Sequence, residues 1–321
     1  MRPTILVTGA TGAVGRHLIG ELQSSGYQVR CQYRARSGTV AGSDWQRMDF
    51  LESLDFSGLV AGCDAVIHLA AETNQGSVMH RVNVEATAAL LAAAQSAGAR
   101  YFGYASSIVV YGSPRRRIVD EATPLLDLRA PLIRQYRANP SMVEYARTKV
   151  LAERAIDEFR PNMTVDIYRP SVIVDLNRVL EAGNWSTVRK LAFAYRQTQY
   201  IYVLDVAAAI LHLLAEALGS SQIRSRIEAF NLCDENCGTF REILTVAHEA
   251  TGDPRYRVSA GLPMAIVLDL AKDTLKFRDA SLRYSLGMLK LCNVKLLGTG
   301  FRFPFGVRWA LGQALAGSAR H

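Results

Sequence analysis

Tyr145 and Lys149 are the two residues whose types and spacing most directly suggest chemistry. They lie four residues apart in "VEYARTKVLAERAIDEF", a helical pattern, so their Cβ atoms lie about 5–6 Å apart on one face. A free phenol titrates near ~10 and is a poor base at neutral pH. An ammonium about 4 Å away contributes on the order of 4 kcal/mol at an effective dielectric constant of about 20. We therefore expect Lys149 to lower the pKa of Tyr145 by about two units, which would let Tyr145 transfer protons.

Three glycines directly after the first apolar run could bind an anion. The stretch "TGATGAVGR" places Gly9, Gly12 and Gly15 between "TILV" and a helical pattern. In such a turn the first glycine permits the tight bend, and the second lets backbone N–H groups approach a pyrophosphate. The third lets the helix pack closely on the sheet. Because the helix amino terminus adds partial positive charge, the spacing predicts a dinucleotide-binding turn.

The elements that must position these groups alternate between strands and helices. Apolar runs such as "TILVTG", "DAVIHLAA" and "YFGYASS" alternate with helical patterns such as "NVEATAALLAAAQSAG" and the segment around Tyr145. This alternation is typical of βαβ units, and "AVIHLA" is apolar on both faces, as a doubly covered strand must be. We expect an α/β fold, namely a Rossmann-type doubly wound parallel sheet with a smaller, mostly helical C-terminal substrate domain.

The alternation loosens after about residue 175. "YIYVLDVAAAILHLLAEAL" still predicts a strand and a helix, and "EAFNLC" another strand, whereas the remainder is mostly helical in pattern. We expect residues 1–180 and 200–235 to form the dinucleotide-binding domain. Residues 181–199 and 236–321 are expected to form a substrate-binding cap over the carboxyl edge of the sheet, where ligands of open α/β sheets bind.

Composition and charge disfavour several classes of protein. The chain has 321 residues, of which 49% are hydrophobic and 21% charged, as in ordinary soluble α/β proteins. The net charge of +8 is spread along the chain apart from "RRR" at residues 115–117, and no nucleic-acid-reading module is found. The expected partner is therefore a small molecule, and neither nucleic acid nor membrane is expected.

Localisation and metal content are inferred from the first residues and the cysteines. The chain enters a strand within a few residues, which leaves no room for a signal peptide. The stretch "GLPMAIVLDLA" is too short to span a membrane and contains Asp269. Five scattered cysteines are typical of reduced thiols, and "CDENC" has no partner pair of Cys or His nearby. We expect a cytoplasmic protein with no transmembrane helix and no metal.

Several motifs in order resemble the extended short-chain dehydrogenase/reductase family, which includes NAD-dependent epimerases and dehydratases. The resemblance begins with Thr8 and the Gly-x-x-Gly-x-x-Gly spacing and extends nearly from end to end. It continues through "DAVIHLAAET", "RVNVEAT", "YASSIVVYG", "YARTK", "YRPSVIV", "YVLDVAAAI", "FNLCDENCGTFREI" and "LLGTGFRFPFGVRWALGQAL". The resemblance implies an NAD(P)-dependent enzyme of this type and a homodimer formed by pairing helices.

The resemblance also assigns roles to individual residues. "YARTK" matches the family's Tyr-x-x-x-Lys and the second serine of "SSIVVYG" its catalytic serine, so Ser107, Tyr145 and Lys149 are the expected catalytic residues. Ser107 would hydrogen-bond the substrate oxygen, Lys149 would also hold the nicotinamide ribose, and His68 would be structural. Besides Lys149, the expected cofactor-binding residues are Gly9, Thr11, Gly12, Ala13, Val14 and Gly15 at the turn, Arg34, Arg36, Asp49 and Phe50 at the adenosine side, Leu69, Ala70 and Ala71 under the cofactor, Asn83 supporting its nicotinamide half, and Pro170, Ser171, Val172 and Ile173 flanking the nicotinamide.

The residue that follows the second strand bears on which dinucleotide binds. "VRCQYR" ends with Arg34, where an acidic residue would hydrogen-bond the ribose of NAD. An arginine suits the 2′-phosphate of NADP, because its planar fork binds phosphate bidentately, and Arg36 would add a second contact. The alternative is that Arg34 is a solvated loop residue. We expect NADP, with NAD as the alternative cofactor.

Departures from the family pattern narrow the expected reaction. Ile108 and Val109 stand where sugar dehydratases of the family carry an acid pair, so dehydration is disfavoured. Asp175 stands where many relatives have glycine. We expect an NADP(H)-dependent oxidoreductase that interconverts a ketone or aldehyde and an alcohol on a small metabolite. The alternatives are an NAD-dependent nucleotide-sugar epimerase and a non-catalytic dinucleotide-sensing regulator.

Overall fold

The contacts within the chain divide it into two compact units. The computed structural model describes residues 2–136, 138–174, 176–187, 190, 199–220, 225–234, 240–257, 290–310 and 312. The first unit comprises Met1–Val110, Asn139–Arg169 and Val206–Phe230, and the second comprises Tyr111–Ala138, Pro170–Asp205 and Asn231–His321. The domain limits expected from the sequence stay a prediction. Much of the expected helical cap, the stretch "GLPMAIVLDLA" and Asp175 lie outside the described residues.

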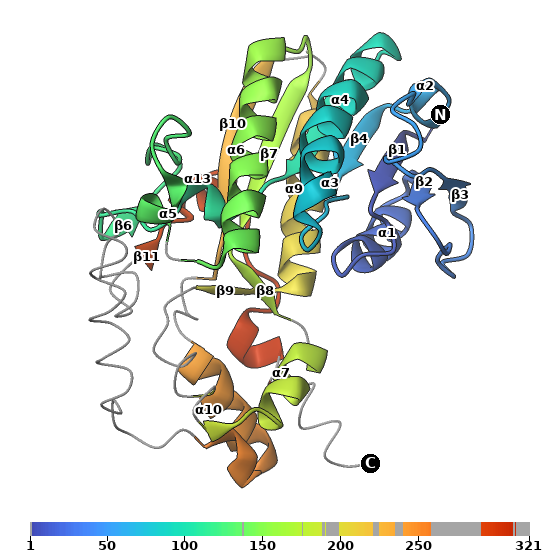
Figure 1. The fold of residues 1–321 in the computed structure, drawn as a ribbon. Coiled ribbons are helices and arrows are strands. Elements are labelled where there is room, and N and C mark those ends of the chain that lie inside the picture. Colours follow the sequence, from blue (N-terminus) through green and yellow to red (C-terminus); the bar gives the residue numbers. More distant parts are fainter. Residues whose placement is uncertain are drawn as a thin grey trace. The chain divides into compact units, whose positions relative to one another are not determined.

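The first unit is built on a seven-stranded sheet with the strand order β10-β7-β5-β4-β1-β2-β3 (Figure 1). Its strands are β1 Thr4–Thr8, β2 Gln28–Tyr33, β3 Asp44–Arg47, β4 Ala65–His68, β5 Tyr101–Ala105, β7 Thr164–Pro170 and β10 Arg226–Leu232. The pairs from β3 across to β7 are parallel. The strand order reverses at β1, because β2 and β3 lie on one side of it and β4, β5 and β7 on the other. This arrangement confirms the predicted Rossmann-type α/β fold.

Apolar helix faces cover this sheet. The helices of the first unit are α1 Gly15–Ser24, α2 Ser57–Val60, α3 Gly76–His80, the π-helical turn Arg81–Glu85, α4 Ala86–Ser96, α6 Pro140–Phe159 and α9 Val203–Gly219, whose first turn belongs to the second unit. In Figure 1, α4 and α6 lie side by side. Leu90 of α4 and Ile156 of α6 share a buried cluster with Val66 of β4 and Phe102 of β5. The helix predicted for "NVEATAALLAAAQSAG" is confirmed as α4, and the first residues of that stretch belong to the π-helical turn Arg81–Glu85.

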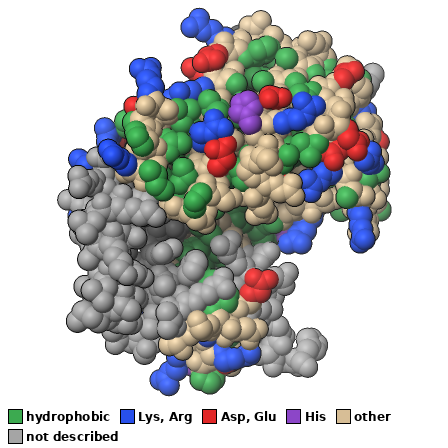
Figure 2. Space-filling model, in the orientation of Figure 1, with side chains coloured by type: hydrophobic (Ala, Val, Ile, Leu, Met, Phe, Trp, Pro, Cys, Tyr) green, Lys and Arg blue, Asp and Glu red, His purple; other side chains and the backbone are tan. Residues whose placement is uncertain are grey.

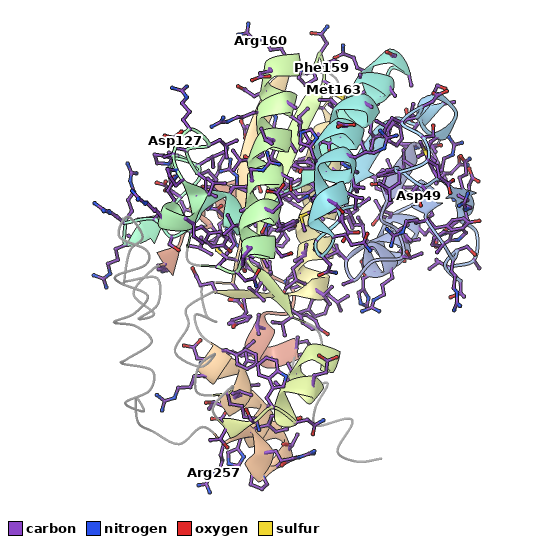
Figure 3. The ribbon with its side chains drawn as sticks, in the orientation of Figure 1. Asp49, Asp127, Phe159, Arg160, Met163 and Arg257 are labelled. Carbon is purple, nitrogen blue, oxygen red and sulfur yellow. The ribbon has the colours of Figure 1, made fainter. Side chains whose placement is uncertain are left out.

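Helix α6 begins and ends at residues suited to those positions. Asn139 caps its first turn by accepting a hydrogen bond from the N–H of Met142 at 2.9 Å, and the following proline needs no N–H partner there. At the other end, Arg160 adopts the left-handed conformation, with φ of 51°, that commonly stops a helix. Figure 3 shows Arg160 at that end of the helix. The helical pattern around Tyr145 is therefore confirmed.

The second unit contains two small parallel sheets and several short helices. Its elements are the 3₁₀ turn Ile108–Tyr111, which begins in the first unit, β6 Ile118–Val119, α5 Leu132–Gln135, β8 Val172–Val174, α7 Leu176–Gly183, β9 Tyr200–Tyr202, α10 Phe240–Thr251, the 3₁₀ turn Pro254–Tyr256, β11 Lys290–Leu291 and α13 Val294–Gly298. β6 pairs with β11 and β8 pairs with β9. Tyr200, Phe240, Leu244 and Val307 form part of one buried core.

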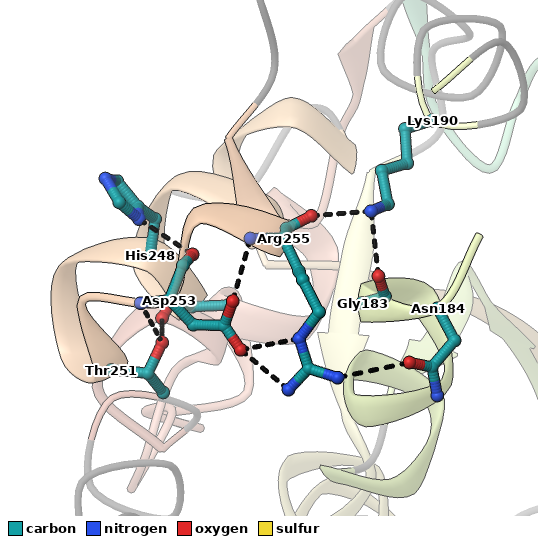
Figure 4. A network of polar contacts seen from close by, with 8 residues as sticks. Gly183, Asn184, Lys190, His248, Thr251, Asp253 and Arg255 are labelled. Carbon is teal, nitrogen blue, oxygen red and sulfur yellow. Dashed lines mark hydrogen bonds and ion pairs between the residues drawn. The ribbon is translucent and has the colours of Figure 1, made fainter. Parts of the chain in front are cut away.

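Lys190 fastens the carboxyl end of α7 in this unit. Its buried ammonium donates hydrogen bonds to the carbonyls of Gly183 at 2.8 Å and Arg255 at 2.5 Å (Figure 4). Arg255 is itself paired with Asp253 at 2.7 Å and bonded to Asn184 at 3.2 Å. A cation at a helix carboxyl end is favoured by the helix dipole. This network therefore explains how a lysine is tolerated in the interior.

Two buried carboxylates hold residues 305–307. Asp205 accepts hydrogen bonds from the N–H groups of Phe305 at 3.1 Å and Gly306 at 2.8 Å. Asp234 accepts one from the N–H of Val307 at 2.8 Å. Burial raises the pKa of Asp205 to about 6, although the two N–H groups oppose this. The carboxylates thus replace the water that these backbone groups would otherwise bind.

The described residues also bear on membranes, metals and surface charge. Within them, no helix is both long and apolar enough to cross a membrane. No cluster of His, Cys, Asp or Glu in these same ranges has the makings of a metal site. On the face that Figure 2 shows, Lys and Arg side chains are interspersed with acidic and apolar ones. The positive net charge is therefore not gathered on that face.

Candidate active site

The glycine turn between β1 and α1 has no room for a side chain at Gly9 or at Gly15. Gly9 has φ of +64°, and a Cβ there would lie 2.7 Å from the nitrogen of Ala70. A Cβ at Gly15 would lie 2.5 Å from the carbonyl oxygen of Gly9. Gly12 is exposed, and a Cβ there would meet only the same oxygen, at 3.1 Å. The three positions thus fit the roles expected of them: a tight bend, an approachable backbone and close helix packing.

This turn fits the pyrophosphate of a dinucleotide. Thr11, Gly12 and Ala13 are exposed, and α1 begins at Val14 and Gly15 with no side-chain cap. The first N–H groups of a helix lack partners within the helix and attract anions. Side chains at positions 9 and 15 would collide with neighbouring backbone atoms and distort the turn. The residues present therefore suit the group that the glycine spacing predicts.

Arg34 follows β2 and is paired with Glu72, a residue that the sequence analysis missed. Its guanidinium lies 3.8 Å from the Glu72 carboxylate, with side chains 62% and 12% exposed, respectively. Glu72 also accepts the N–H groups of residues 73–75. Burial works to raise the pKa of Glu72, but these N–H groups and Arg34 outweigh it and hold the pKa below its usual value. Glu72 is therefore a fixed anion beside Arg34, while Arg36 is exposed.

The other residues expected at the adenosine side lie in the same unit. Asp49, labelled in Figure 3, accepts the N–H of Leu51 at 2.9 Å and is partly exposed. Phe50 is buried, with its ring centroid 5.1 Å from that of Phe56. Gln32 joins the glycine turn to this region, because its side chain accepts from the N–H of Gly9 at 3.0 Å and donates to the Met48 carbonyl at 2.6 Å.

The segment after β4 is held by His68. The Thr8 hydroxyl lies 2.6 Å from His68 Nδ1, and the Thr87 hydroxyl lies 3.0 Å from Nε2. Because Thr87 donates its own proton to the carbonyl of Asn83 at 2.8 Å, it accepts from Nε2, and Nδ1 accepts from Thr8. Burial lowers the pKa of His68 to about 3, so the ring stays neutral. This geometry agrees with a structural role for His68.

The three residues after His68 meet the glycine turn at backbone level. The N–H of Leu69 donates to the Thr8 carbonyl at 3.2 Å, and that of Ala70 donates to the Thr8 hydroxyl at 3.3 Å. Leu69 and Ala70 are half-buried, and Ala71 is exposed. They therefore line the edge at which β1 and β4 end, where the resemblance places the cofactor.

Asn83 lies in the π-helical turn Arg81–Glu85 and is buried. Its amide nitrogen donates to the Glu72 carbonyl at 2.9 Å and to the Thr148 hydroxyl at 3.0 Å. Its amide oxygen accepts the N–H of Glu72 at 2.8 Å. Single π turns inside helices are common at functional sites. Asn83 thus joins the backbone at Glu72 to α6, which carries Thr148.

Lys149 contacts both Tyr145 on α6 and the end of β5, two residues before Ser107. The Nζ of Lys149 lies 5.7 Å from the ring centroid of Tyr145 and 4.7 Å from that of Tyr104. It donates a hydrogen bond to the carbonyl of Ala105 at 2.6 Å. Ser107 follows two residues later, is partly exposed and accepts the N–H of Val109 at 3.3 Å. The structure therefore places the three predicted catalytic residues in one region of the first unit.

The pKa shifts of this pair correct the expectation from the sequence. Burial raises the pKa of Tyr145 above its ordinary value, so the predicted lowering by Lys149 is wrong in this structure. Lys149 is itself buried, which lowers its own pKa to about 7 against the opposing charge of Glu153. The sequence argument counted the attraction between the two groups and left out the desolvation of both.

Glu153 and Arg169 form a buried ion pair beside these residues, which the sequence analysis also missed. Arg169 donates two hydrogen bonds to the Glu153 carboxylate, the shorter at 2.6 Å. The hydroxyl of Ser106 donates to the same carboxylate. The available signal was an acidic residue within a helical stripe that is otherwise buried, four positions after Lys149.

The residues expected beside the nicotinamide lie in the second unit. Ser171 donates its N–H to the Leu232 carbonyl at 2.9 Å, and Val172 begins β8. Pro170 and Ile173 are half-buried. Among the described residues, the buried hydroxyl of Ser171 has no hydrogen-bond partner. An orphaned polar atom of this kind suits a site that binds a polar ligand.

The chain is similar to known proteins of one family. The sequence profile of the NAD dependent epimerase/dehydratase family matches residues 5–224. The chain is 33% identical over 167 residues to a 3-beta-hydroxysteroid dehydrogenase of Mycolicibacterium neoaurum, covering 47% of this chain and 42% of that protein. It is 28% identical over 167 residues to a UDP-glucose 4-epimerase of Rhizobium leguminosarum bv. trifolii, covering 49% and 47%. The alignments therefore span less than half the length of these relatives.

A solved structure shows the same fold over nearly the whole chain. A short-chain dehydrogenase/reductase superfamily protein from Agrobacterium tumefaciens with bound NAD superposes with a TM-score of 0.71 at 22% identity. The superposition covers 99% of this chain and 97% of the other. The profile match confirms the predicted family. The chain belongs to the NAD dependent epimerase/dehydratase family.

Proposed function

We propose that this protein is an NADP(H)-dependent oxidoreductase that interconverts a ketone or aldehyde and an alcohol on a small metabolite. One observation carries the proposal. Lys149 and Tyr145 share a face of α6, and the Lys149 ammonium is bonded to the end of the strand from which Ser107 follows. A tyrosine and a serine carried by two elements that the same ammonium contacts are suited to proton transfer at a carbonyl oxygen.

The roles of the residues follow from their chemistry. In reduction, the Tyr145 hydroxyl donates a proton to the substrate oxygen, and the Ser107 hydroxyl donates a hydrogen bond that holds this oxygen in place. The Lys149 ammonium has further donors besides the one bonded to Ala105 and would hold a ribose hydroxyl. What a bound nicotinamide dinucleotide would supply is the hydride for the carbonyl carbon.

The raised pKa of Tyr145 favours reduction. A phenol whose pKa lies above 10 is protonated at neutral pH, which is the form that a proton donor needs. Alcohol oxidation would need the phenolate, which burial disfavours. This direction of the pKa shift supports a proton-donating role for Tyr145 in the proposed reduction.

Arg34 supports NADP as the cofactor. It follows β2, at the position from which dinucleotide folds contact the adenosine ribose. Its guanidinium is largely exposed and forms a weak ion pair with Glu72, at 3.8 Å. A 2′-phosphate offers a stronger, bidentate partner.

A combined binding and turnover experiment tests this function. Mass spectrometry of ligands released from the purified protein identifies any retained dinucleotide, and fluorescence titration compares NADPH with NADH. Tyr145→Phe should abolish turnover in a screen of ketones and aldehydes while leaving the Kd for NADPH within a few-fold. Turnover that survives this change would reject the mechanism.

A second candidate is an NAD-dependent nucleotide-sugar epimerase. The similarity to a UDP-glucose 4-epimerase over 167 residues favours it. Such an enzyme would retain NAD through purification and would convert its sugar without net change of redox state. Tightly held NAD and equal or better binding of NADH than NADPH would select this candidate over the first.

A further inference from the structure

A buried ion pair lies one helical turn beyond Lys149. Glu153 follows Lys149 by four residues and Tyr145 by eight, so the three side chains share a face of α6. Arg169 donates from Nε to one oxygen of Glu153 at 3.1 Å and from Nη2 to the other at 2.6 Å. The two side chains are only 5% and 7% exposed. This is a bidentate pair in the interior, shielded from water.

The same helix face holds two successive residues at the end of β5. Lys149 binds the carbonyl of Ala105 at 2.6 Å, and Glu153 accepts the hydroxyl proton of Ser106. The N–H of Ser106 is bound to the Tyr168 carbonyl at 2.8 Å. Ser107 is the next residue. The backbone just before Ser107 is therefore held by Lys149, Glu153 and the Tyr168 carbonyl together.

The fold alone does not explain two charges at this place. Removing two ions from water costs about as much as their attraction returns, and apolar residues of similar volume often stabilise a core as well or better. A buried ion pair is therefore weak evidence for a purely structural role. The feature that needs a nearby anion is the buried ammonium of Lys149.

We propose that Glu153 is a positioning residue of the candidate active site, which keeps Lys149 protonated and holds the end of β5 that carries Ser107. Arg169 balances its charge and fixes its orientation. The inference rests on the proposed role of Lys149 in the reaction. Glu153 itself acts through Lys149 and Ser106 and does not touch substrate.

The charges of the groups around Lys149 determine the direction in which Glu153 shifts the pKa of Lys149. On α6 these are Tyr145 and Glu153, from β5 the ring of Tyr104, and from β4 the imidazole of His68. Tyr145, Tyr104 and His68 are all neutral near pH 7, because burial raises the pKa of both tyrosines and lowers that of His68. Of these groups Glu153 is therefore the one that carries a charge to oppose the desolvation of the ammonium.

The two partners of the ion pair must act on Lys149 in opposite directions. Glu153→Gln keeps an oxygen for Ser106 and removes the negative charge, so Lys149 should lose its proton at lower pH. Arg169→Met removes the positive charge and leaves the carboxylate in place, so Lys149 should lose its proton at higher pH. A general loss of packing would not shift the titration of Lys149 in opposite directions in the two variants.

NMR titration of the intact protein, labelled with ¹³C at the lysine ε-carbon, measures this directly. The chain has six lysines, so few signals appear, and Lys149→Arg identifies the signal of Lys149. We expect its titration midpoint to fall by about one pH unit in the Glu153→Gln variant and to rise by about one unit in Arg169→Met. An unmoved midpoint in either folded variant, or shifts of the same sign, would overturn the proposal.

A third variant keeps the test decisive if a single change prevents folding. Glu153→Leu combined with Arg169→Met removes both charges and is expected to fold, because it leaves no unpaired ion. The Lys149 midpoint should fall here too, since the carboxylate is gone, and an unchanged midpoint would reject the role of Glu153. The titration needs neither substrate nor dinucleotide, so its failure is separate from failure of the Tyr145→Phe test of function.

Discussion

The side-chain amide of Asn83 donates a hydrogen bond of 3.0 Å to the hydroxyl of Thr148, across 65 residues of chain. Thr148 in turn donates to the carbonyl of Tyr145 at 2.8 Å. Both atoms of the same amide also bind the backbone of Glu72. One side chain thus ties the loop after β4 to the helix that carries the candidate catalytic residues.

Asn83→Ala should therefore destabilise the protein more than an ordinary polar substitution. The change leaves the N–H and the carbonyl of Glu72 without these partners in a partly buried site, which costs about 1–3 kcal/mol. Urea unfolding measures the free energy of unfolding. Asn74→Ala, at an exposed position in the same loop, is the matched control and should change this free energy by less than about 0.5 kcal/mol. Equal effects of the two changes would contradict the role given to Asn83.

Gly15→Ala should disrupt the glycine turn. The new Cβ would lie 2.5 Å from the Gly9 carbonyl oxygen and 2.8 Å from the Cα of Ala10, both backbone atoms that cannot move aside easily. We expect a loss of about 1–3 kcal/mol in the free energy of unfolding, together with weaker dinucleotide binding.

Gly20→Ala is the control for this change, because Gly20 lies in the same helix and a Cβ there meets nothing within 4 Å. It should stabilise the protein by up to about 1 kcal/mol through helix propensity. Thermal unfolding of the two variants compares them. If Gly15→Ala were as stable as Gly20→Ala, the close approach described for the turn would be wrong.

Glu72→Gln should strengthen NADPH binding and leave NADH binding nearly unchanged. The substitution keeps an oxygen for the N–H groups of residues 73–75 and releases Arg34 from its carboxylate partner. A partly exposed ion pair contributes at most about 1 kcal/mol, so the gain should be no more than about fivefold in Kd. Fluorescence titration with both cofactors measures it.

The Arg34→Ala background decides whether Glu72 acts through Arg34. There, Glu72→Gln should have no selective effect on NADPH, since the guanidinium that it releases is absent. A gain that persists without Arg34 would show a direct effect of the Glu72 charge on the ligand instead.

Asp205 should make stability depend on pH in a definite direction. Because burial raises its pKa from 3.8 to about 6, the folded protein binds this proton more tightly than the unfolded chain. The stabilisation is full below pH 3.8 and is lost as the pH rises through 6. Asp205→Asn cannot lose a proton, so relative to the wild type it should gain on the order of 1 kcal/mol or more between about pH 4 and about pH 7.

Urea unfolding at several pH values tests this, because contributions of other titrating groups cancel in the difference between the two proteins. The amide also loses one acceptor for the N–H groups of Phe305 and Gly306. That cost is the same at every pH, so it does not change how the difference in free energy of unfolding between the two proteins varies with pH. A difference that stays constant with pH would show that Asp205 does not titrate in this range.

Most elements of the central sheet and its helices could be predicted from the sequence. Runs such as "AVIH" are apolar on both faces and become β4, buried at the centre of the sheet. The spacing of Tyr145 and Lys149 needs only a helix to put them on one face, and the helical pattern around them becomes α6. Both inferences use neighbours in sequence, for which periodicity is sufficient.

Pairings between distant residues could not be predicted in this way. Ser106, Glu153 and Arg169 meet across 47 and 16 residues, and the contact depends on how strands and helix pack. The pKa of Tyr145 moved opposite to expectation because burial is a property of the packed structure. The assignment of cofactor-binding and catalytic residues stays a prediction until a ligand is bound.

The neutral ring of His68 links two segments that lie far apart in the sequence. The ring accepts a hydrogen bond from Thr8, just before the glycine turn, and donates one to Thr87, just after the π-helical turn. Neither segment can slide without stranding a polar atom in an apolar interior. Any displacement of the glycine turn relative to the segment that carries Asn83 would therefore break one of these hydrogen bonds.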